Sequence, residues 1–393
     1  MKIKNLKLHN VGGIPFLSLE NLNQNCNLIC GENGVGKTNI LDSIASLYSS
    51  FNNNILLSRS GCDSGNIEAE IMFFEEGEEN KSISMSITKR KPDNSSWVRC
   101  ELSDYNKKLL YLKVNRVFEY KEQNSIEADP KDITGERNLS GLKNEKLKSW
   151  FINRHLHSAH EGNLTNTQKE NFKLAVDCFA KLNSDYSFKK TTTENEIIVS
   201  SPTGDIYFEY LSSGFKSIIF ILLGIIRELE FRFNHDNNAI LAKDFDGIIL
   251  IDEVELHLHP EWQGRIISIL KETFPKVQFF ITTHSPHVVQ TAEKDEVIAL
   301  QRTQENNITR RELLNSKYGY QGWTIEEILE DIMGMPTLRT DLYMNLKQKF
   351  DKALDEKNKN LAESAYAELN EMLHPDFPLR PILKLQLDTL LDN

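Results

Sequence analysis

The sequence predicts an α/β fold in which helices flank a mixed sheet, and three short apolar segments are the main reason. Continuous or nearly continuous apolar runs, each the length of a buried strand, occupy residues 26–30, 247–251 and 277–283. Each run ends in residues with ligand-binding chemistry, and a helical pattern of apolar residues follows the first at 39–47. Because ligands bind beyond the carboxyl ends of parallel strands, we expect these three endings to share one edge of the sheet.

The amino-terminal part predicts a second group of strands, which is antiparallel. Apolar residues alternate with polar ones at 67–74 and 82–89, as they do in strands with one buried face. Residues 1–30 also read as strands, with a turn at 11–13, and 109–114 is a further strand candidate. We therefore expect an antiparallel subdomain beside the first apolar run.

The middle and the end of the chain carry helical patterns. Helical spacing at 142–157 and 167–183 predicts a helical insertion. Thr324 and Glu327 form a capping box, which predicts the start of another helix there. The remaining predicted elements are hairpin strands at 197–200 and 205–210, helices at 218–229, 262–274, 342–354 and 361–373, and a last strand at 296–300. The tail at 377–391 is apolar and interrupted by prolines.

These patterns divide the chain into four parts. Residues 1–120 form an amino-terminal lobe with the glycine-rich loop, and 121–187 form the helical insertion. Residues 188–322 form a second lobe that carries the two later apolar runs, and 323–393 form a helical unit. This last unit has no catalytic cluster, so it reads equally well as a cap on the lobes and as a docking surface for a partner.

Composition and charge restrict the classes of function. The 393 residues carry a formal net charge of −11, so no global basic field attracts nucleic acid. The five cysteines contain no C-x-x-C pair, which indicates free thiols in a reducing cytosol. No apolar run approaches the roughly 18 residues of a spanning helix, and the first four residues alternate like a strand rather than a signal peptide. We therefore expect a cytoplasmic protein without a membrane partner.

The loop after the first apolar run reads GENGVGKT and fits the pattern G-x-x-x-x-G-K-[S/T], which wraps the phosphates of a nucleotide. Its glycines permit backbone angles that a Cβ would forbid, so that amide groups can close on the phosphates. Lys37 is expected to reach the β- and γ-phosphates of ATP, and the Thr38 hydroxyl to hold Mg²⁺. The predicted nucleotide-binding residues of this loop are Gly31, Glu32, Asn33, Gly34, Val35, Gly36, Lys37 and Thr38.

Two adjacent carboxylates, Asp252 and Glu253, end the second apolar run. One can hold Mg²⁺ through water, while the other can orient or deprotonate an attacking water. Such carboxylates rarely end a buried strand without a function. His284 ends the third run, where it could sense a γ-phosphate by hydrogen bonding. Taken alone, however, the triplet His284-Ser285-Pro286 reads more simply as a capped turn.

Two groups of histidines raise the question of a metal site. His257 and His259 lie beside carboxylates that suit Mg²⁺ better than zinc, so we prefer a role without metal for them. His155, His157 and His160 have no cysteine or carboxylate at ligand spacing, which favours a solvated helix face.

Four motifs together resemble the ABC-type ATPase heads of the SMC, RecF and OLD group. GENGVGKTNILDSI, LSSGFKS, IILIDEVELHLHP and ITTHSPH occur in the order of that family, within residues 1–300. The resemblance implies an ABC-type P-loop NTPase head. It also implies a head-to-tail homodimer that holds two ATP molecules between its protomers and opens on hydrolysis.

The resemblance also implies a role for individual residues. Asp252 would be the magnesium-linked aspartate, Glu253 the catalytic glutamate and His284 the switch histidine. The LSSGFKS segment would be the signature motif, which contacts the γ-phosphate bound by the opposite subunit. It departs from the common LSGGQ pattern at its third and fifth positions. The signature residues expected to face the nucleotide are Ser212, Ser213 and Gly214.

The compact head, the short insertion and a YGYQGWTIEEIL segment resemble the PtuA family, the ATPase subunits of Septu-type and retron-linked antiphage systems. The partner in that family is an HNH nuclease, PtuB. The resemblance implies a nucleotide-gated scaffold, a homodimer or a higher homo-oligomer, that controls a separate nuclease. DNA or retron nucleic acid is a further candidate partner. No D-x-D pair follows His284, so we expect no nuclease chemistry in this chain.

Two other functions stay open at this point. A RecF-like ATPase that acts directly on DNA in repair or recombination would bind DNA with a steep salt dependence, and the charge of −11 ranks it second. The ATPase of a membrane transporter would usually keep the glutamine of the signature, where this chain has Phe215.

Overall fold

The computed structural model describes residues 1–49, 56–74, 79–88, 101–114, 147–233, 239–314 and 316–392. This part of the chain divides into two compact units, Met1–Gly334 and Met335–Asn393. The start of the predicted helical insertion, up to residue 146, lies outside the described residues. None of the helices in these ranges combines the length and the apolar character that crossing a membrane requires.

A mixed sheet forms the centre of the first unit and, among the described residues, contains six strands in the order β13-β12-β3-β11-β10-β6. The strands are β3 (Cys26–Gly31), β6 (Leu109–Leu112), β10 (Ile248–Ile251), β11 (Gln278–Thr282), β12 (Val297–Arg302) and β13 (Ile308–Arg310). The neighbours from β12 to β6 are parallel, whereas β13 pairs antiparallel with β12. Burial on both faces explains the continuous apolar runs. The carboxyl ends of β3, β10 and β11 consequently share one edge, as predicted.

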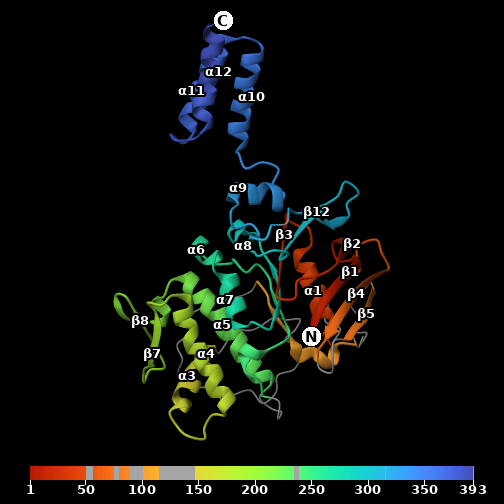
Figure 1. Ribbon diagram of the computed structural model, residues 1–393, viewed down its shortest axis with the longest axis vertical. Helices are drawn as coiled ribbons and strands as arrows, with labels where there is room; N and C mark the ends of the chain where they lie inside the picture. Colours follow the sequence, from red (N-terminus) through yellow and green to blue (C-terminus); the bar gives the residue numbers. More distant parts are fainter. Residues whose placement is uncertain are drawn as a thin grey trace. The chain divides into compact units, whose positions relative to one another are not determined.

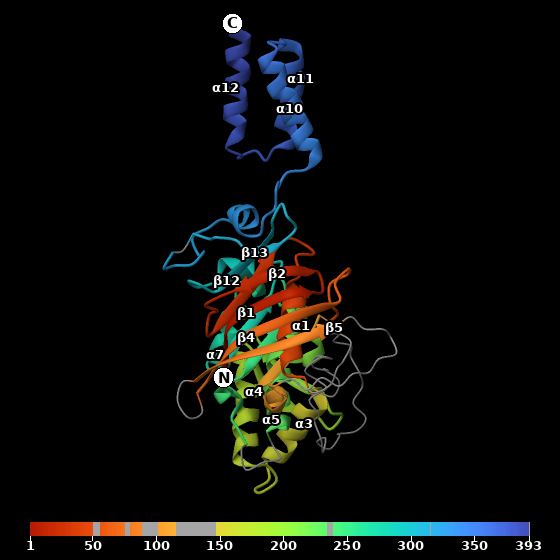
Figure 2. The same cartoon turned by 90° about the vertical axis from the view of Figure 1, so that its right-hand side faces the viewer.

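An antiparallel sheet packs on one side of the central sheet. Its order within the described ranges is β2-β1-β4-β5, and Figure 1 shows helix α1 (Lys37–Leu47) between the two sheets. Apolar side chains from both sheets and from α1 form one buried cluster, which includes Leu6, Ile40 and Leu250. In Figure 2, β1, β4 and β5 run side by side at the front. The strands are β1 (Lys2–Val11), β2 (Ile14–Leu19), β4 (Ser64–Phe73) and β5 (Glu79–Thr88).

Helices cover the other face of the central sheet. They are α3 (Leu147–Ser158), α4 (Asn166–Leu182), α5 (Ser213–Arg232) and α7 (Ile266–Thr273), and their apolar side chains share one cluster with that face. A small antiparallel sheet of β7 (Ser187–Thr191), β8 (Ile197–Ser201) and β9 (Gly204–Tyr207) lies next to α4 in the chain. Helix α5 is longer than the predicted 218–229, because Ser212 caps it by accepting a hydrogen bond from the Phe215 amide at 3.3 Å.

A buried ion pair joins α3 to α5. The Arg154 guanidinium contacts Glu230 Oε1 through Nη2 at 2.7 Å and through Nε at 2.8 Å, and both side chains are 2% exposed. Trp150 donates a hydrogen bond to the same oxygen at 3.0 Å. Because a buried charge is costly without its partner, this pair fixes α3 against the helix that carries the predicted signature residues.

The remaining segments of the first unit are short. The single helix predicted at 262–274 is wrong, because one helix ends at Gln263 and the next begins at Ile266. The capping box of Thr324 and Glu327 is confirmed by reciprocal hydrogen bonds of 3.2 and 2.8 Å. The short elements are η1 (Ser103–Lys108), η2 (Phe208–Tyr210), η3 (Ala242–Asp244), α6 (Pro260–Gln263), α8 (Pro286–Gln290), α9 (Ile325–Glu327) and the π-helical turn η4 (Ile328–Ile332).

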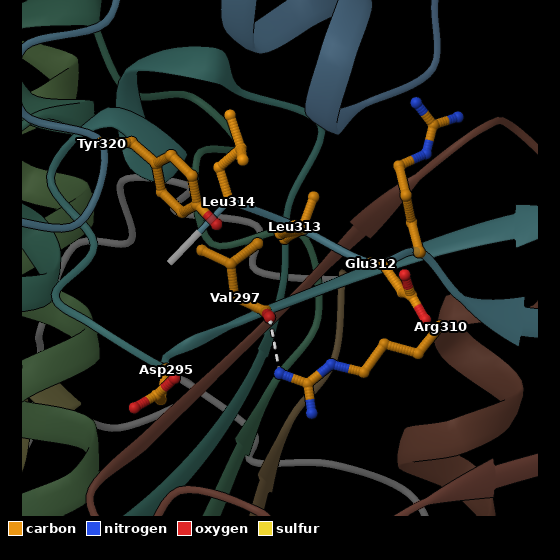
Figure 3. Close-up of a pocket in the computed structure, with 8 residues that line it drawn as sticks. Asp295, Val297, Arg310, Glu312, Leu313, Leu314 and Tyr320 are labelled. Atoms are coloured by element: carbon orange, nitrogen blue, oxygen red, sulfur yellow. Dashed lines mark hydrogen bonds between the residues drawn. The ribbon is translucent and has the colours of Figure 1, made fainter. Parts of the chain in front are cut away.

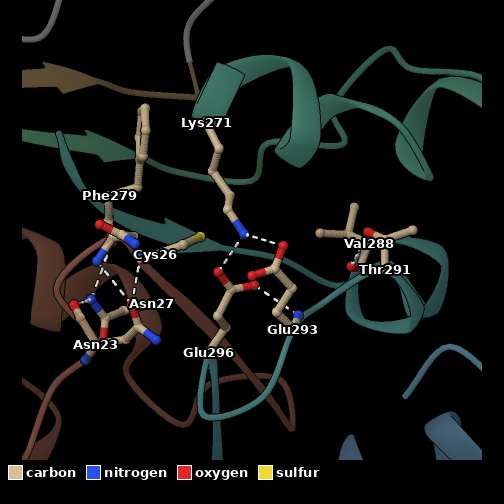
Figure 4. A network of polar contacts seen from close by, with 10 residues as sticks. Asn23, Cys26, Asn27, Lys271, Phe279, Val288, Thr291, Glu293 and Glu296 are labelled. Atoms are coloured by element: carbon tan, nitrogen blue, oxygen red, sulfur yellow. Dashed lines mark hydrogen bonds and ion pairs between the residues drawn. The ribbon is translucent and has the colours of Figure 1, made fainter. Parts of the chain in front are cut away.

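A polar network closes the amino-terminal edge of the central sheet (Figure 4). Lys271 of α7 contacts Glu293 at 2.9 Å and the almost fully buried Glu296 at 2.7 Å, just before β12. The side chain of Asn27 in β3 donates to the Phe279 carbonyl of β11 at 3.3 Å. These contacts hold neighbouring strands and α7 together at the edge opposite to the predicted site.

The second unit is a helical bundle with its own apolar core. In its described part it consists of α10 (Asp341–Asp355), α11 (Lys359–Met372) and α12 (Leu379–Asp392). Buried residues of this core include Phe350, Leu369 and Leu383. Helix α12 was not predicted, because its segment contains prolines. Pro381 lies in the first turn of the helix, where a missing N–H costs no hydrogen bond.

Candidate nucleotide-binding site

The predicted phosphate loop connects β3 to α1 and has the backbone that its glycines allow. Gly31, Gly34 and Gly36 have φ angles of 134°, 74° and 96°. A Cβ on Gly31 would lie 2.3 Å from the Leu300 carbonyl oxygen of β12, so this position requires glycine. Gly36 precedes α1, and no side chain caps that helix start. The first amide groups of α1 are therefore not satisfied by a capping side chain, and they suit a phosphate.

Lys37 lies folded over the loop in this structure. Its Nζ donates to the carbonyl oxygens of Gly31 at 2.9 Å and Glu32 at 3.0 Å. Burial lowers the pKa of Lys37, while the nearby Glu255 and Glu253 carboxylates act in the opposite direction. The two hydrogen bonds hold the Lys37 side chain inside the loop, near the carboxylates at the edge of the sheet.

Thr38 and Asp252 meet across the sheet edge, although they lie far apart in the sequence. The Thr38 hydroxyl lies 3.1 and 3.2 Å from the two carboxylate oxygens of the buried Asp252. Thr282 at the end of β11 donates to Asp252 Oδ1 at 2.6 Å. Its hydroxyl oxygen in turn accepts from the Glu253 amide at 2.7 Å. One hydroxyl of β11 therefore orients both predicted carboxylate residues.

The backbone turns sharply after β10. Glu253 has a φ of 48° and His257 a φ of 66°, in the left-handed region that costs a non-glycine residue about 1–2 kcal/mol. Hydrogen bonds from the Leu256 amide to the Glu253 carbonyl at 3.0 Å and from the Leu258 amide to the Glu255 carbonyl at 2.8 Å hold this turn. The half-buried Glu253 is thereby placed at the sheet edge, beside Asp252.

His284 follows β11 at the same edge, and its side chain is exposed. Its amide donates to Glu255 Oε1 at 2.5 Å, which links the histidine loop to the turn after β10. Ser285 caps α8 and also donates to Gln263 Oε1 at 2.6 Å. The triplet His284-Ser285-Pro286 is therefore a capped turn, and this turn presents an exposed imidazole at the edge of the site.

Comparisons with known proteins decide the family. The family described as "AAA domain, putative AbiEii toxin, Type IV TA system" matches residues 26–290. The Septu protein PtuA of Bacillus thuringiensis is 42% identical to this chain over 98% of this chain and 97% of that protein. The chain belongs to the PtuA family.

Other relatives of this PtuA family member match less of their own length. The retron Ec83 probable ATPase of Escherichia coli is 31% identical over 49% of this chain and 34% of that protein. A second Septu protein PtuA, from Bacillus mycoides (strain KBAB4), is 24% identical over 81% of this chain and 43% of that protein. Among solved structures, an SMC head domain from Thermotoga maritima has a TM-score of 0.46 and 16% identity over 80% of this chain and 100% of that domain.

The signature residues of this PtuA family member lie at the start of α5. Ser212 and Ser213 are exposed at the start of α5, and in the described residues no hydrogen bond joins them to residues 31–38. Gly214 is buried, and a Cβ there would lie 2.9 Å from the Trp262 ring. Phe215 also packs edge-on against Trp262, with the ring centroids 5.9 Å apart, so this residue belongs to the core.

Sequence reasoning missed three groups at the site of this PtuA family member. Glu255 was not predicted, although it is the third carboxylate in the run DEVE, and that run was the available signal. Asp42 and Lys113 form an ion pair at the end of β6, and no pattern in the sequence indicates that these two residues are close. Two of the histidines for which we preferred a role without metal have structural contacts: His259 caps α6, and His155 lies 2.8 Å from the Thr191 hydroxyl.

A separate cavity of about 410 Å³ lies along β12 and the segment after β13 (Figure 3). Val297 and Tyr320 contribute to its wall, and Arg310 at its rim donates to the Val297 carbonyl at 3.2 Å. Its lining contains acidic, basic and apolar side chains but none of the predicted site residues.

Proposed function

We propose that this chain binds and hydrolyses ATP with Mg²⁺ and serves as the ATPase subunit of a bacterial antiphage defence complex. The single observation that carries the proposal is the contact of Thr38 with Asp252 at 3.1 Å beside Lys37. A hydroxyl and a buried carboxylate at one point are the hard oxygen donors that Mg²⁺ prefers, so these residues fit the metal. When bound, Mg²⁺ would neutralise charge on the phosphate oxygens.

The chain's own residues supply the rest of the proposed chemistry. Lys37 exchanges its two carbonyl partners for the β- and γ-phosphates, and the backbone amides of residues 31–38 enclose them. Glu253 accepts a proton from the attacking water or orients it, and its backbone amide donates a hydrogen bond to the Thr282 hydroxyl, which holds the residue in place. His284 contacts the γ-phosphate from the other side. These assignments are supported by the position of all four groups at one sheet edge.

We further propose that the working unit is a homodimer or a higher homo-oligomer. Ser212 and Ser213 are exposed, and among the described residues no hydrogen bond joins them to the phosphate loop of their own chain. A second copy, placed head to tail, would bring them to the γ-phosphate and complete the site. We also propose that the four parts of the chain predicted from the sequence are its functional units, and that residues 323–393 form the unit that docks a partner.

Replacing Ser212 with arginine tests this pairing. The bulky cation should block the second copy while leaving each chain's own phosphate loop intact, so ATP-dependent dimerisation should weaken at least about tenfold. Sedimentation measures the dimer, and a fluorescent ATP analogue measures binding. Ser158→Arg, at an exposed position on α3, serves as the control. ATP-dependent dimers of normal affinity in the Ser212 variant would contradict the head-to-tail arrangement.

The proposed partner is an HNH nuclease of the PtuB type, in the cytoplasm. Support comes from the membership of the PtuA family and from exposed apolar side chains on the second unit, including Leu342, Ile382 and Leu385. Exposed apolar groups of this kind are common in protein interfaces.

Co-purification with the nuclease encoded by the neighbouring gene tests this partnership. The wild-type chain should retain the nuclease, and Leu385→Glu should weaken retention about tenfold or more, because a charge would enter an apolar contact. Gln386→Glu, at the next exposed position of α12, should have no such effect. Recovery of no nuclease with the wild type would contradict the proposal. ATP-dependent DNA binding with a steep salt dependence would then favour a RecF-like role.

A further inference from the structure

A lysine that has no assigned role lies at the same sheet edge as the carboxylates. Strand β6 is the parallel neighbour of β10, and the Leu112 carbonyl accepts a hydrogen bond from the Asp252 amide at 2.9 Å. Lys113, the next residue, therefore leaves the sheet beside Asp252. Its Nζ lies 3.4 Å from Asp42 Oδ1, with the two side chains 29% and 11% exposed.

The partner of this lysine belongs to the helix that follows the phosphate loop. Asp42 lies one turn after Thr38 on α1, so the two side chains share one face of that helix. Tyr111 of β6 also donates to Asp42 Oδ1, at 3.1 Å. The Asp42 carboxylate thus holds the Lys113 ammonium against α1, close to the groups that would face MgATP.

We propose that Lys113 is a second phosphate-binding cation of the site, which Asp42 holds in position until the nucleotide arrives. The inference rests on the proposed function, because it concerns the same ATP site. MgATP keeps negative charge that Lys37 alone does not neutralise. A lysine ammonium on its flexible four-carbon stem can turn from a carboxylate to a phosphate without any change of backbone.

The same strand offers a matched control at its other end. Lys108 immediately precedes β6 and contacts Asp246 at 2.5 Å, with its side chain 21% exposed. Lys108 is similar to Lys113 in exposure and in its contact with an aspartate, although Asp246 is 42% exposed and Asp42 only 11%, and the Lys108 pair lies at the opposite edge of the sheet. A general effect of removing such a pair from β6 would therefore appear in Lys108→Met as well.

The test measures the affinity for a fluorescent ATP analogue in single and double variants. Lys113→Met should weaken ATP binding about 10- to 100-fold, the loss expected for one charged hydrogen bond. Lys113→Arg should retain most of the affinity. Lys108→Met should bind ATP as the wild type does, and Asp42→Asn, which keeps Lys113, should lose less affinity than Lys113→Met.

The double variant Asp42→Asn/Lys113→Met separates a phosphate ligand from a merely structural lysine. It removes both charges of the pair, so it should fold even if Lys113→Met alone does not, and thermal unfolding without nucleotide checks this. We expect its ATP affinity to be as low as that of Lys113→Met. Recovery of wild-type affinity, or an unaffected Lys113→Met variant, would overturn the inference and leave the proposed function intact. A wild-type chain that binds no ATP would overturn both.

Discussion

Replacing Lys37 with alanine should weaken ATP binding by about 100-fold or more. The structure places the Lys37 ammonium inside the loop, with two hydrogen bonds to loop carbonyls at 2.9 and 3.0 Å. In the nucleotide complex these donors would turn to phosphate oxygens. Two charged hydrogen bonds at about 1.5–3 kcal/mol each account for a loss of this size.

Titration calorimetry with ATP measures this effect, and Lys2→Ala is its control. Lys2 resembles Lys37 in two respects: its Nζ donates to a backbone carbonyl, that of Gln24 at 2.5 Å, and burial lowers its pKa. It lies in β1, outside the candidate site. Normal ATP affinity in Lys37→Ala would mean that residues 31–38 do not hold the triphosphate. An equal loss in both variants would point to a defect of folding instead.

The parts of the molecule that the sequence predicted well are those with local rules. A strand, a glycine loop and a helix follow one another in 26–47, so their connection could be read directly. The meeting of Thr38 with Asp252 also followed from a rule, because parallel strands end at the same edge of a sheet. The length of α5 was underestimated, since its start depends on a single cap by Ser212.

The parts that the sequence did not predict depend on contacts between distant segments. The three residues of β13 form a strand only because β12 lies beside them. Lys113 contacts Asp42 because β6 pairs with β10. The residue pattern of a single strand does not predict which strand will lie beside it. Glu255 reaches the His284 amide only through the left-handed turn after β10. Each case needs the tertiary fold before the side chains can be placed.

Replacing Glu253 with glutamine should slow ATP hydrolysis about 10²- to 10⁴-fold while changing ATP affinity little. Glutamine keeps the size of the side chain but cannot take a proton from water. The Glu253 amide would still bond to Thr282, so the backbone at the sheet edge should keep its place. Because the ATP stays unhydrolysed, the closed dimer proposed above should accumulate. Sedimentation measures this dimer, and an assay of phosphate release measures hydrolysis.

Glu255→Gln tests whether the loss of hydrolysis is specific to Glu253, because Glu255 is a second carboxylate near Lys37. Its Oε1 accepts a hydrogen bond from the His284 amide, and a glutamine oxygen can accept the same bond. If Glu255 only positions the histidine loop, its replacement should cost much less activity than that of Glu253. Exposed Glu261→Gln should cost nothing. A larger loss in Glu255→Gln than in Glu253→Gln would assign the role of base to Glu255, since both carboxylates lie near Lys37 at this sheet edge.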